Sequence, residues 1–274
     1  MSTPAITIPA GRRGPQGLSG RPARAIRDAL SIADRNLIAY RRVPQLLVFS
    51  TIQPVIFVLL FRYVFGGAIR VPGGISYVDY LIPGIFVQTV VFGAINTAVG
   101  LSADVGSGML ERFRALPMAR SAVLAGRTLA DLARNVFVVA LMAGVGFAVG
   151  FRVHTNALYF LGGLVLVLAF AYAMSWVFAT VGLAVGDPET AQAAAFPVMA
   201  PLVFASSAFV PVSSMPSWLQ GFAGHQPVSV VASAVRGLAL GGPTASYLLQ
   251  AIAWCVGIIV VCAPLAVWRY RRTV

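Results

Sequence analysis

The side chains that could perform catalysis are few and far apart in this chain. Its two histidines are His154 and His225, and its eight acidic residues are scattered, with no paired carboxylates inside an apolar run. General acid–base catalysis needs such groups within reach of one substrate, and a zinc site needs several His, Cys or carboxylate ligands together. The sequence therefore predicts no catalytic residue and no metal site. His225, beside Gln226 and Pro227, is better explained as a helix-capping or interfacial residue.

The absence of lysine limits where a nucleotide could bind. All 20 basic residues are arginine. A P-loop places the lysine of Gly-x-x-x-x-Gly-Lys on the nucleotide phosphates, so this chain has no conventional P-loop. If ATP drives its work, we expect ATP and Mg²⁺ on a separate partner chain and no cofactor on this one.

Uncharged polar and aromatic groups inside the apolar runs are the remaining candidates for binding. Gln88 and Asn96 lie two helical turns apart with Phe92 between them, a combination that suits an amphipathic or aromatic substrate. The other candidates are similar groups in later runs. For each of these groups taken singly, a hydrogen bond between helices is the favoured role. The predicted substrate path consists of Gln88, Phe92, Asn96, Ser175, Trp176, Ser206 and Ser207.

Composition shows what kind of framework must position these groups. The chain is 58% hydrophobic and 10% charged, with a mean hydropathy of +0.84, whereas soluble domains carry about 25% charged residues. These values predict an all-α polytopic membrane protein. The net charge of +12 does not indicate nucleic acid, because the arginines flank apolar runs and so act as topology signals and contacts with anionic lipid.

Six apolar runs are each long enough, or nearly so, to cross a bilayer, which takes about 20 residues. They lie at about 45–65, 79–103, 128–150, 157–185, 190–212 and 246–268. The third and fourth runs carry the small-residue spacings Gly146/Gly150 and Gly182/Gly186, which allow close helix packing. The middles of the runs hold essentially no ionisable group, and Asp131 and Arg134 are expected to pair with each other at the start of the third run.

The segments around these runs complete the predicted domain, residues 24–268. Residues 1–23 are predicted to be a disordered arm, and residues 269–274 a short tail. Residues 24–42 are apolar on one helical face, which indicates an amphipathic helix in the membrane interface or else the solvated start of the next helix. Sixteen of the 20 arginines lie in the first arm and helix, in residues 104–134 and in the tail. This bias predicts that both termini and the 104–127 loop are cytoplasmic.

Residues 213–245 do not fit a plain six-span pattern. Two apolar patches, 216–223 and 227–240, are broken by Gly224 and Pro227 and are too short to span. We expect a helical hairpin that enters the outer leaflet and returns, with Trp218 as an interfacial anchor. The residues singled out in this hairpin are Pro216, Trp218, His225 and Pro227.

The order of these elements and several short sequence motifs resemble those of the ABC-2 type permeases, and in particular the daunorubicin/doxorubicin-resistance exporter branch. The motifs are Tyr63-Val-Phe-Gly-Gly67, Tyr80-Leu-Ile-Pro-Gly84, Gly108-Met-Leu-Glu-Arg-Phe-Arg-Ala-Leu-Pro117, Ser207-Ala-Phe-Val-Pro211, Met215-Pro-Ser-Trp-Leu-Gln220, and Gln226-Pro-Val-Ser229 followed by Ala234 to Gly242. Many relatives have Asn-Pro or Ser-Pro where this chain has Gln226-Pro227. The resemblance covers nearly the whole chain after residue 24.

The resemblance implies a function. Such permeases form dimers, as two copies or two related chains, in a bacterial cytoplasmic membrane. They pair with cytoplasmic ATP-binding subunits and export hydrophobic drugs or lipids. It also implies that a coupling helix at residues 108–117 receives the push of the ATPase, through Glu111, Arg112, Phe113, Arg114, Leu116 and Pro117.

Two other functions stay open. A secondary transporter is disfavoured because the runs show no buried acid for ion coupling. A membrane-embedded lipid-modifying enzyme is disfavoured because no His/Asp/Glu cluster lies near an interface.

Overall fold

The computed structural model describes residues 45–69, 71, 74–108 and 120–273, and its regular secondary structure there is entirely helical. The predicted arm and amphipathic helix, and residues 109–117 of the predicted coupling helix, lie outside the described residues. The helices are α2 (Gln45–Leu59), the π-helix η2 (Leu60–Phe65), α3 (Tyr77–Gly106), α5 (Arg120–Ala148), α6 (Ala157–Val185), α7 (Pro188–Phe204), the 3₁₀ turn η4 (Val212–Ser214), α8 (Ser217–His225), α9 (Pro227–Leu240) and α10 (Ala245–Thr273).

Four of these helices, α3, α5, α6 and α10, are long and apolar enough to cross a membrane. The other two predicted spans correspond to shorter helices. The first is α2 with η2. The second is α7, which ends at Phe204 rather than at residue 212. The predicted end of that run was therefore wrong, for reasons given below.

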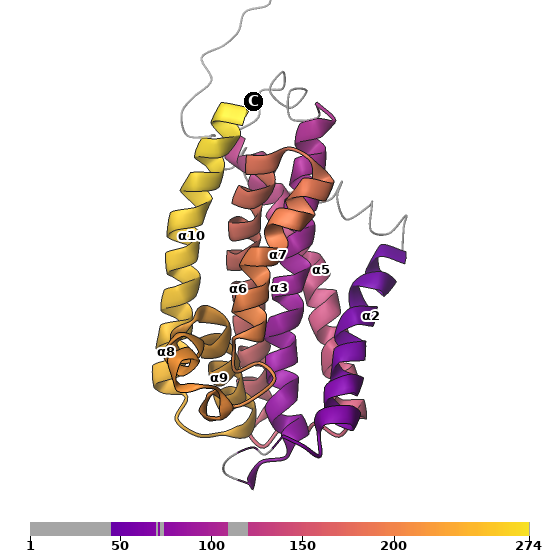
Figure 1. Ribbon diagram of the computed structural model, residues 1–274, viewed down its shortest axis with the longest axis vertical. Helices are drawn as coiled ribbons and strands as arrows, with labels where there is room; N and C mark the ends of the chain where they lie inside the picture. Colours follow the sequence, from indigo (N-terminus) through magenta and orange to yellow (C-terminus); the bar gives the residue numbers. More distant parts are fainter. Residues whose placement is uncertain (1–44, 70, 72–73, 109–119, 274) are drawn as a thin grey trace, which may run out of the picture.

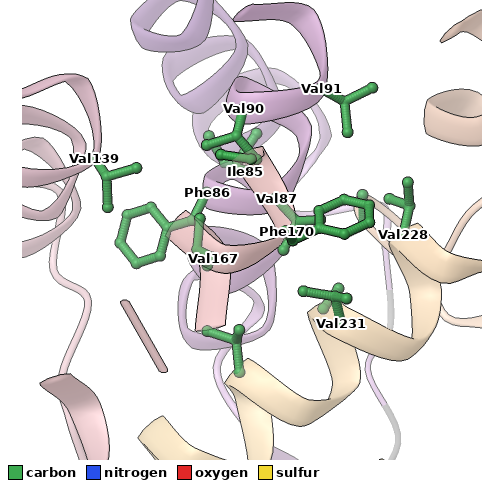
Figure 2. Packing of buried hydrophobic residues seen from close by; sticks show 14 of the residues in the cluster. Ile85, Phe86, Val87, Val90, Val91, Val139, Val167, Phe170, Val228 and Val231 are labelled. Carbon is green, nitrogen blue, oxygen red and sulfur yellow. The ribbon is translucent and has the colours of Figure 1, made fainter. Parts of the chain in front are cut away.

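Helix α3 lies at the centre of the bundle (Figure 1), and its most apolar window is 78% buried, against 17% for α10. It packs against α6, α7, α9, α5 and α2. Helices α8 and α9 gather at the end of the bundle opposite the C-terminus. Figure 2 shows the core between α3, α6 and α9, where Phe86 and Val87 lie near Val167, Phe170 and Val231.

Two of the glycines in the predicted small-residue spacings do lie at close contacts. A side chain at Gly182 would collide with the Ala98 carbonyl of α3, and one at Gly146 would come within 2.9 Å of Ile82 Cγ2. By contrast, Gly162, on the same helix as Gly182, has open space around the position of a Cβ. Gly182 thus allows α6 to pack directly on the backbone of α3.

We therefore expect Gly182→Ala to lower the thermal unfolding midpoint, because overpacking typically costs about 1–3 kcal/mol. The matched change Gly162→Ala should leave it unchanged or raise it, since alanine favours a helix over glycine by about 1 kcal/mol. Unfolding of both variants in the same detergent would measure the difference. Equal midpoints would contradict the proposed close packing.

Asp131 and Arg134, the two ionisable residues predicted at the start of the third span, lie inside the helix bundle. Helix α5 starts at Arg120, earlier than predicted, and this places buried Asp131 and Arg134 well inside it. Thr97 Oγ donates to Asp131 over 2.6 Å, and Arg134 Nη2 donates to the Gly93 carbonyl over 2.8 Å. Both side chains thereby connect α5 to the middle of α3.

Candidate functional site

The chain leaves the helical conformation after Phe204 and runs irregularly to Pro211. Local sequence favours this break, since Pro211 cannot continue a helix and serine hydroxyls compete for backbone groups. Ser206 Oγ indeed donates to the Val203 carbonyl over 2.6 Å and accepts from the Ala208 N–H over 3.1 Å. Irregular backbone in a membrane protein needs other partners for its polar groups.

Side chains from α9 and the α8–α9 junction supply many of these partners. Gln226 Nε2 donates to the carbonyls of Leu202 and Ala205, over 2.9 Å each. Ser229 Oγ accepts from the Ser207 N–H over 2.8 Å. The end of α7 is therefore fixed to the start of α9.

Arg236 and two tyrosines bind the rest of the break. Arg236 Nη2 donates to the carbonyls of Ser207 and Ala208, over 2.5 and 3.2 Å, and its Nε donates to the Tyr80 carbonyl over 2.8 Å. Its guanidinium lies 3.7 Å from the centre of the Tyr80 ring. The Tyr80 hydroxyl donates to Ser207 O over 2.9 Å, and the Tyr77 hydroxyl donates to Phe209 O over 3.0 Å. The break, α3 and α9 form one hydrogen-bonded unit.

The same unit needs glycine at position 84. A Cβ there would collide with the Ala208 carbonyl. Helix α3 thus lies directly against the backbone of the break.

Two cavities flank this unit. The first, of about 420 Å³, is almost entirely apolar and is lined by Met174, Val177, Leu202, Gly221, Phe222, His225, Gln226, Pro227, Trp254 and Ile258. The second, of about 340 Å³, is more polar and contains Tyr80, Ser207, Ser233, Arg236 and Tyr247 in its lining. Both volumes lie in the range of small-molecule sites.

His225 gives the apolar cavity a defined polar edge. Its Nδ1 lies 2.9 Å from the Gly221 carbonyl oxygen, which can only accept, so Nδ1 carries the proton. The His225 side chain is exposed. The cavity suits an apolar molecule, with His225 and Gln226 as polar residues in its lining.

The predicted substrate-path residues are not gathered at one place. Gln88 is fully buried, Phe92 is half-buried with its ring 6.2 Å from that of Phe57, and Asn96 is exposed. Ser175 bonds its own helix, and Trp176 belongs to a second cluster with Leu101, Leu124 and Tyr270. Only Ser206 and Ser207 belong to the break. Their role in transport stays a prediction.

Gln88 stands out because neither its Oε1 nor its Nε2 has a hydrogen-bond partner among the described residues. Burying an unpaired amide costs about 1–3 kcal/mol. We expect Gln88→Leu to raise the unfolding midpoint of the isolated chain. Transport measured on the same variant then separates two roles: a fall shows that substrate or a partner uses the amide, and unchanged export of every compound tested would discard Gln88 as a substrate contact.

The predicted hairpin residues lie where the two short helices begin and end. Pro216 caps α8, exposed Trp218 is in its first turn, His225 ends it, and Pro227 starts α9. The break between the helices thus falls at Gln226. Their depth in a membrane stays a prediction.

The predicted coupling residues Glu111, Arg112, Phe113, Arg114, Leu116 and Pro117 lie outside the described residues. The helices that flank them are fastened together, because Arg127 Nη1 lies 2.7 Å from Asp104 Oδ2. A side chain at Gly100 would collide with the same arginine. The end of α3 and the start of α5 are therefore held together on either side of the intervening segment.

Sequence reasoning missed Arg236, which it counted only as one of the four arginines outside the segments predicted to be cytoplasmic, with Arg62, Arg70 and Arg152. A usable signal was present: Arg236 lies inside the apolar patch 227–240, and a buried arginine needs several partners. Tyr77 and Tyr80 carried no comparable signal, because tyrosine is common at membrane interfaces.

Comparisons with known proteins agree with this architecture. A family model described as "ABC-2 type transporter" matches residues 28–240. The chain is 34% identical over 256 residues to the daunorubicin resistance ABC transporter permease protein DrrB1 of Streptomyces coeruleorubidus, covering 92% of this chain and 89% of that one. It is 31% identical to the probable doxorubicin resistance ABC transporter permease protein DrrC of Mycobacterium tuberculosis, covering 81% and 80%. It is 28% identical to the doxorubicin resistance ABC transporter permease protein DrrB of the same species, covering 89% and 86%. The chain is therefore a membrane-embedded member of the ABC-2 type transporter family.

Proposed function

We propose that this chain is the transmembrane permease subunit of an ATP-driven exporter that moves hydrophobic drug-like or lipid compounds out across a bacterial cytoplasmic membrane. The observation that carries the proposal is its 34% identity to a drug-resistance permease over 92% of the chain. A separate ATP-binding subunit supplies the energy, and a second permease, identical or related, completes the membrane part.

Six spans, a re-entrant hairpin and cytoplasmic termini form the proposed topology. The four long helices supply spans two, three, four and six, while α2 with η2 and the shorter α7 supply spans one and five. Helices α8 and α9 lie at the end of the bundle away from the C-terminus (Figure 1). The arginine bias puts the C-terminal end in the cytoplasm, and the hairpin therefore belongs to the outer half.

The apolar cavity at α8 and α9 is the proposed outer binding site for substrate. Aromatic side chains of Phe222 and Trp254 supply apolar area, and His225 supplies a polar group at its edge. The seven predicted path residues would serve earlier steps, or structural roles, within the bundle.

Buried Asp131 is the observation that favours a second function, ion-coupled secondary transport. Such transporters carry an acid inside their spans, and Asp131 is 2% exposed. Its bond from Thr97 and the family relationship favour a structural role instead.

Transport into inside-out vesicles separates the two functions. The complex of this chain with its ATP-binding subunit, with daunorubicin as the probe, should accumulate substrate only with hydrolysable ATP, and dissipation of the proton gradient should leave uptake unchanged. Uptake driven by an imposed proton gradient without ATP, and lost in Asp131→Asn, would replace the ABC function with the ion-coupled one. Failure of any ATP-binding protein to co-purify would also contradict the proposal.

A further inference from the structure

Arg236 is a buried cation that the described part of the chain does not neutralise. The side chain is 9% exposed, and its partners are the carbonyls of Tyr80, Ser207 and Ala208, the Ser207 hydroxyl and the Tyr80 ring. Asp104 pairs with Arg127 instead, and Asp79 Oδ2 lies 3.3 Å from His154 Nε2. Backbone carbonyls and counter-ions both stabilise buried charges in membrane proteins, but the carbonyl dipoles here reduce the cost of burial without cancelling the positive charge.

The 340 Å³ cavity provides room for that counter-ion beside the guanidinium. Ser233 stands one turn before Arg236 on α9, so both side chains face the same side of the helix. The Ser233 hydroxyl bonds to no group in the described residues, and Ser207 lines the cavity as well. One Nη1 proton of Arg236 also remains after its bond to Ser207 Oγ.

The remaining walls of the cavity are largely apolar and include Val71, Ile75, Val212 and Leu240. A small inorganic anion would leave these walls without contacts. A molecule with an anionic oxygen group on an apolar body would satisfy both parts of the lining, and arginine is well suited to phosphate oxygens.

We propose that this cavity binds the phosphate group of an anionic phospholipid. The phosphate pairs with Arg236 and accepts from Ser233, while the glycerol and upper acyl carbons contact the apolar walls. Because Arg236 also holds the break after α7, the bound lipid fastens the hairpin to α3. The site is separate from the apolar cavity proposed for substrate and does not depend on what the protein exports.

The test uses the full chain reconstituted in nanodiscs of phosphatidylcholine, with or without phosphatidylglycerol. The readouts are the thermal unfolding midpoint and, after detergent extraction, the phosphatidylglycerol retained, measured by mass spectrometry. Ser233→Leu fills the cavity but keeps Arg236, and Ser233→Asp places a carboxylate beside the guanidinium in place of the lipid. Ser213→Leu makes the same change at an exposed serine nearby that lines neither cavity.

Phosphatidylglycerol should raise the midpoint of the wild-type protein and of Ser213→Leu, and should be retained by both. The rise in midpoint and the retention of lipid should both be lost in Ser233→Leu and Ser233→Asp. In phosphatidylcholine alone, the unfolding midpoint of Ser233→Asp should be higher than that of the wild type. Should Ser233→Leu not fold, Ser233→Asp decides the matter. Equal stabilisation of all four proteins by phosphatidylglycerol, or of none, would overturn the proposal. Stabilisation by inorganic phosphate added to phosphatidylcholine nanodiscs, without retained lipid, would make free phosphate the ligand and overturn the lipid assignment.

Discussion

Replacing Arg236 with leucine is expected to remove most of the folded protein from the membrane. The leucine keeps apolar bulk in α9 but donates nothing to the carbonyls of Ser207 and Ala208. Hydrogen bonds to a charged group contribute about 1.5–3 kcal/mol each. A loss of about 3 kcal/mol or more is a large share of the roughly 5–15 kcal/mol that stabilises a typical protein.

The loss of stability should be larger than the burial of the Arg236 side chain alone suggests, because Arg236 connects α9, α3 and the break. Tyr80 would retain its bond to Ser207 O, but its ring would lose the stacked cation, and Ala208 O would lose its partner from α9. The break after α7 would then be held by Gln226, Ser229 and the two tyrosines alone. Irregular backbone without partners is poorly tolerated in a membrane.

The matched control is Arg152→Leu, at the same end of the bundle. Arg152 is exposed, and its side chain donates only to the nearby carbonyls of Phe147 and Phe151. Membrane levels by immunoblot and unfolding midpoints in detergent would compare the two. Similar levels and midpoints for both variants would show that Arg236 does not hold the break.

The long helices were predictable because their signal is strong and local. Residues 157–185 form α6 with the predicted bounds, since Asn156 caps its first turn and Gly186, at φ +75°, ends it. A long apolar run between a capping side chain and a glycine leaves little choice of boundary. The predicted bounds of the two short helices, α8 and α9, were also close to those observed, because Gly224 and Pro227 interrupt the apolar pattern there.

What sequence could not supply was contact between distant segments. The early end of α7 depends on donors from positions 77, 80, 226 and 236, which hydropathy alone does not place beside Ser207. For the same reason the contact of Asp131 with Thr97 of α3 could not be predicted. Hydrogen bonds between helices determine both the end of α7 and the contact of Asp131. The positions of apolar runs in the sequence do not predict such bonds.

The two ends of α3 contact different parts of the chain. At one end Tyr77, Tyr80 and Gly84 hold the break and, through it, the hairpin. At the other end Asp104 pairs with Arg127. Because α3 is a single helix of 30 residues, we expect a displacement at its Asp104 end to reach the break at its other end. Such rigid-body shifts are one established way in which transport proteins switch state.

Reversing the charges of Glu111 and Arg114 is therefore expected to abolish ATP-driven transport while leaving the fold intact. Both residues belong to the segment between α3 and α5, and polar contacts with the ATP-binding subunit are their predicted role. Charge reversal turns attraction into repulsion, and like charges at an interface cost several kcal/mol. Each 1.4 kcal/mol is a factor of about ten in affinity or rate, so productive coupling should fall by about two orders of magnitude.

Two readouts on one reconstituted preparation identify the cause of the loss. Substrate-stimulated ATPase activity and transport should both collapse, while the unfolding midpoint of the permease stays at the wild-type value, because the Asp104–Arg127 pair that fixes the flanking helices is untouched. Arg271→Glu serves as the control, since it makes the same kind of change at an exposed arginine on the same end of the bundle. If the Glu111/Arg114 double reversal transports as well as Arg271→Glu does, these two charges are not the coupling contact. The arginines of the segment would then act only as topology signals, and the push of the ATPase would have to enter α3 elsewhere.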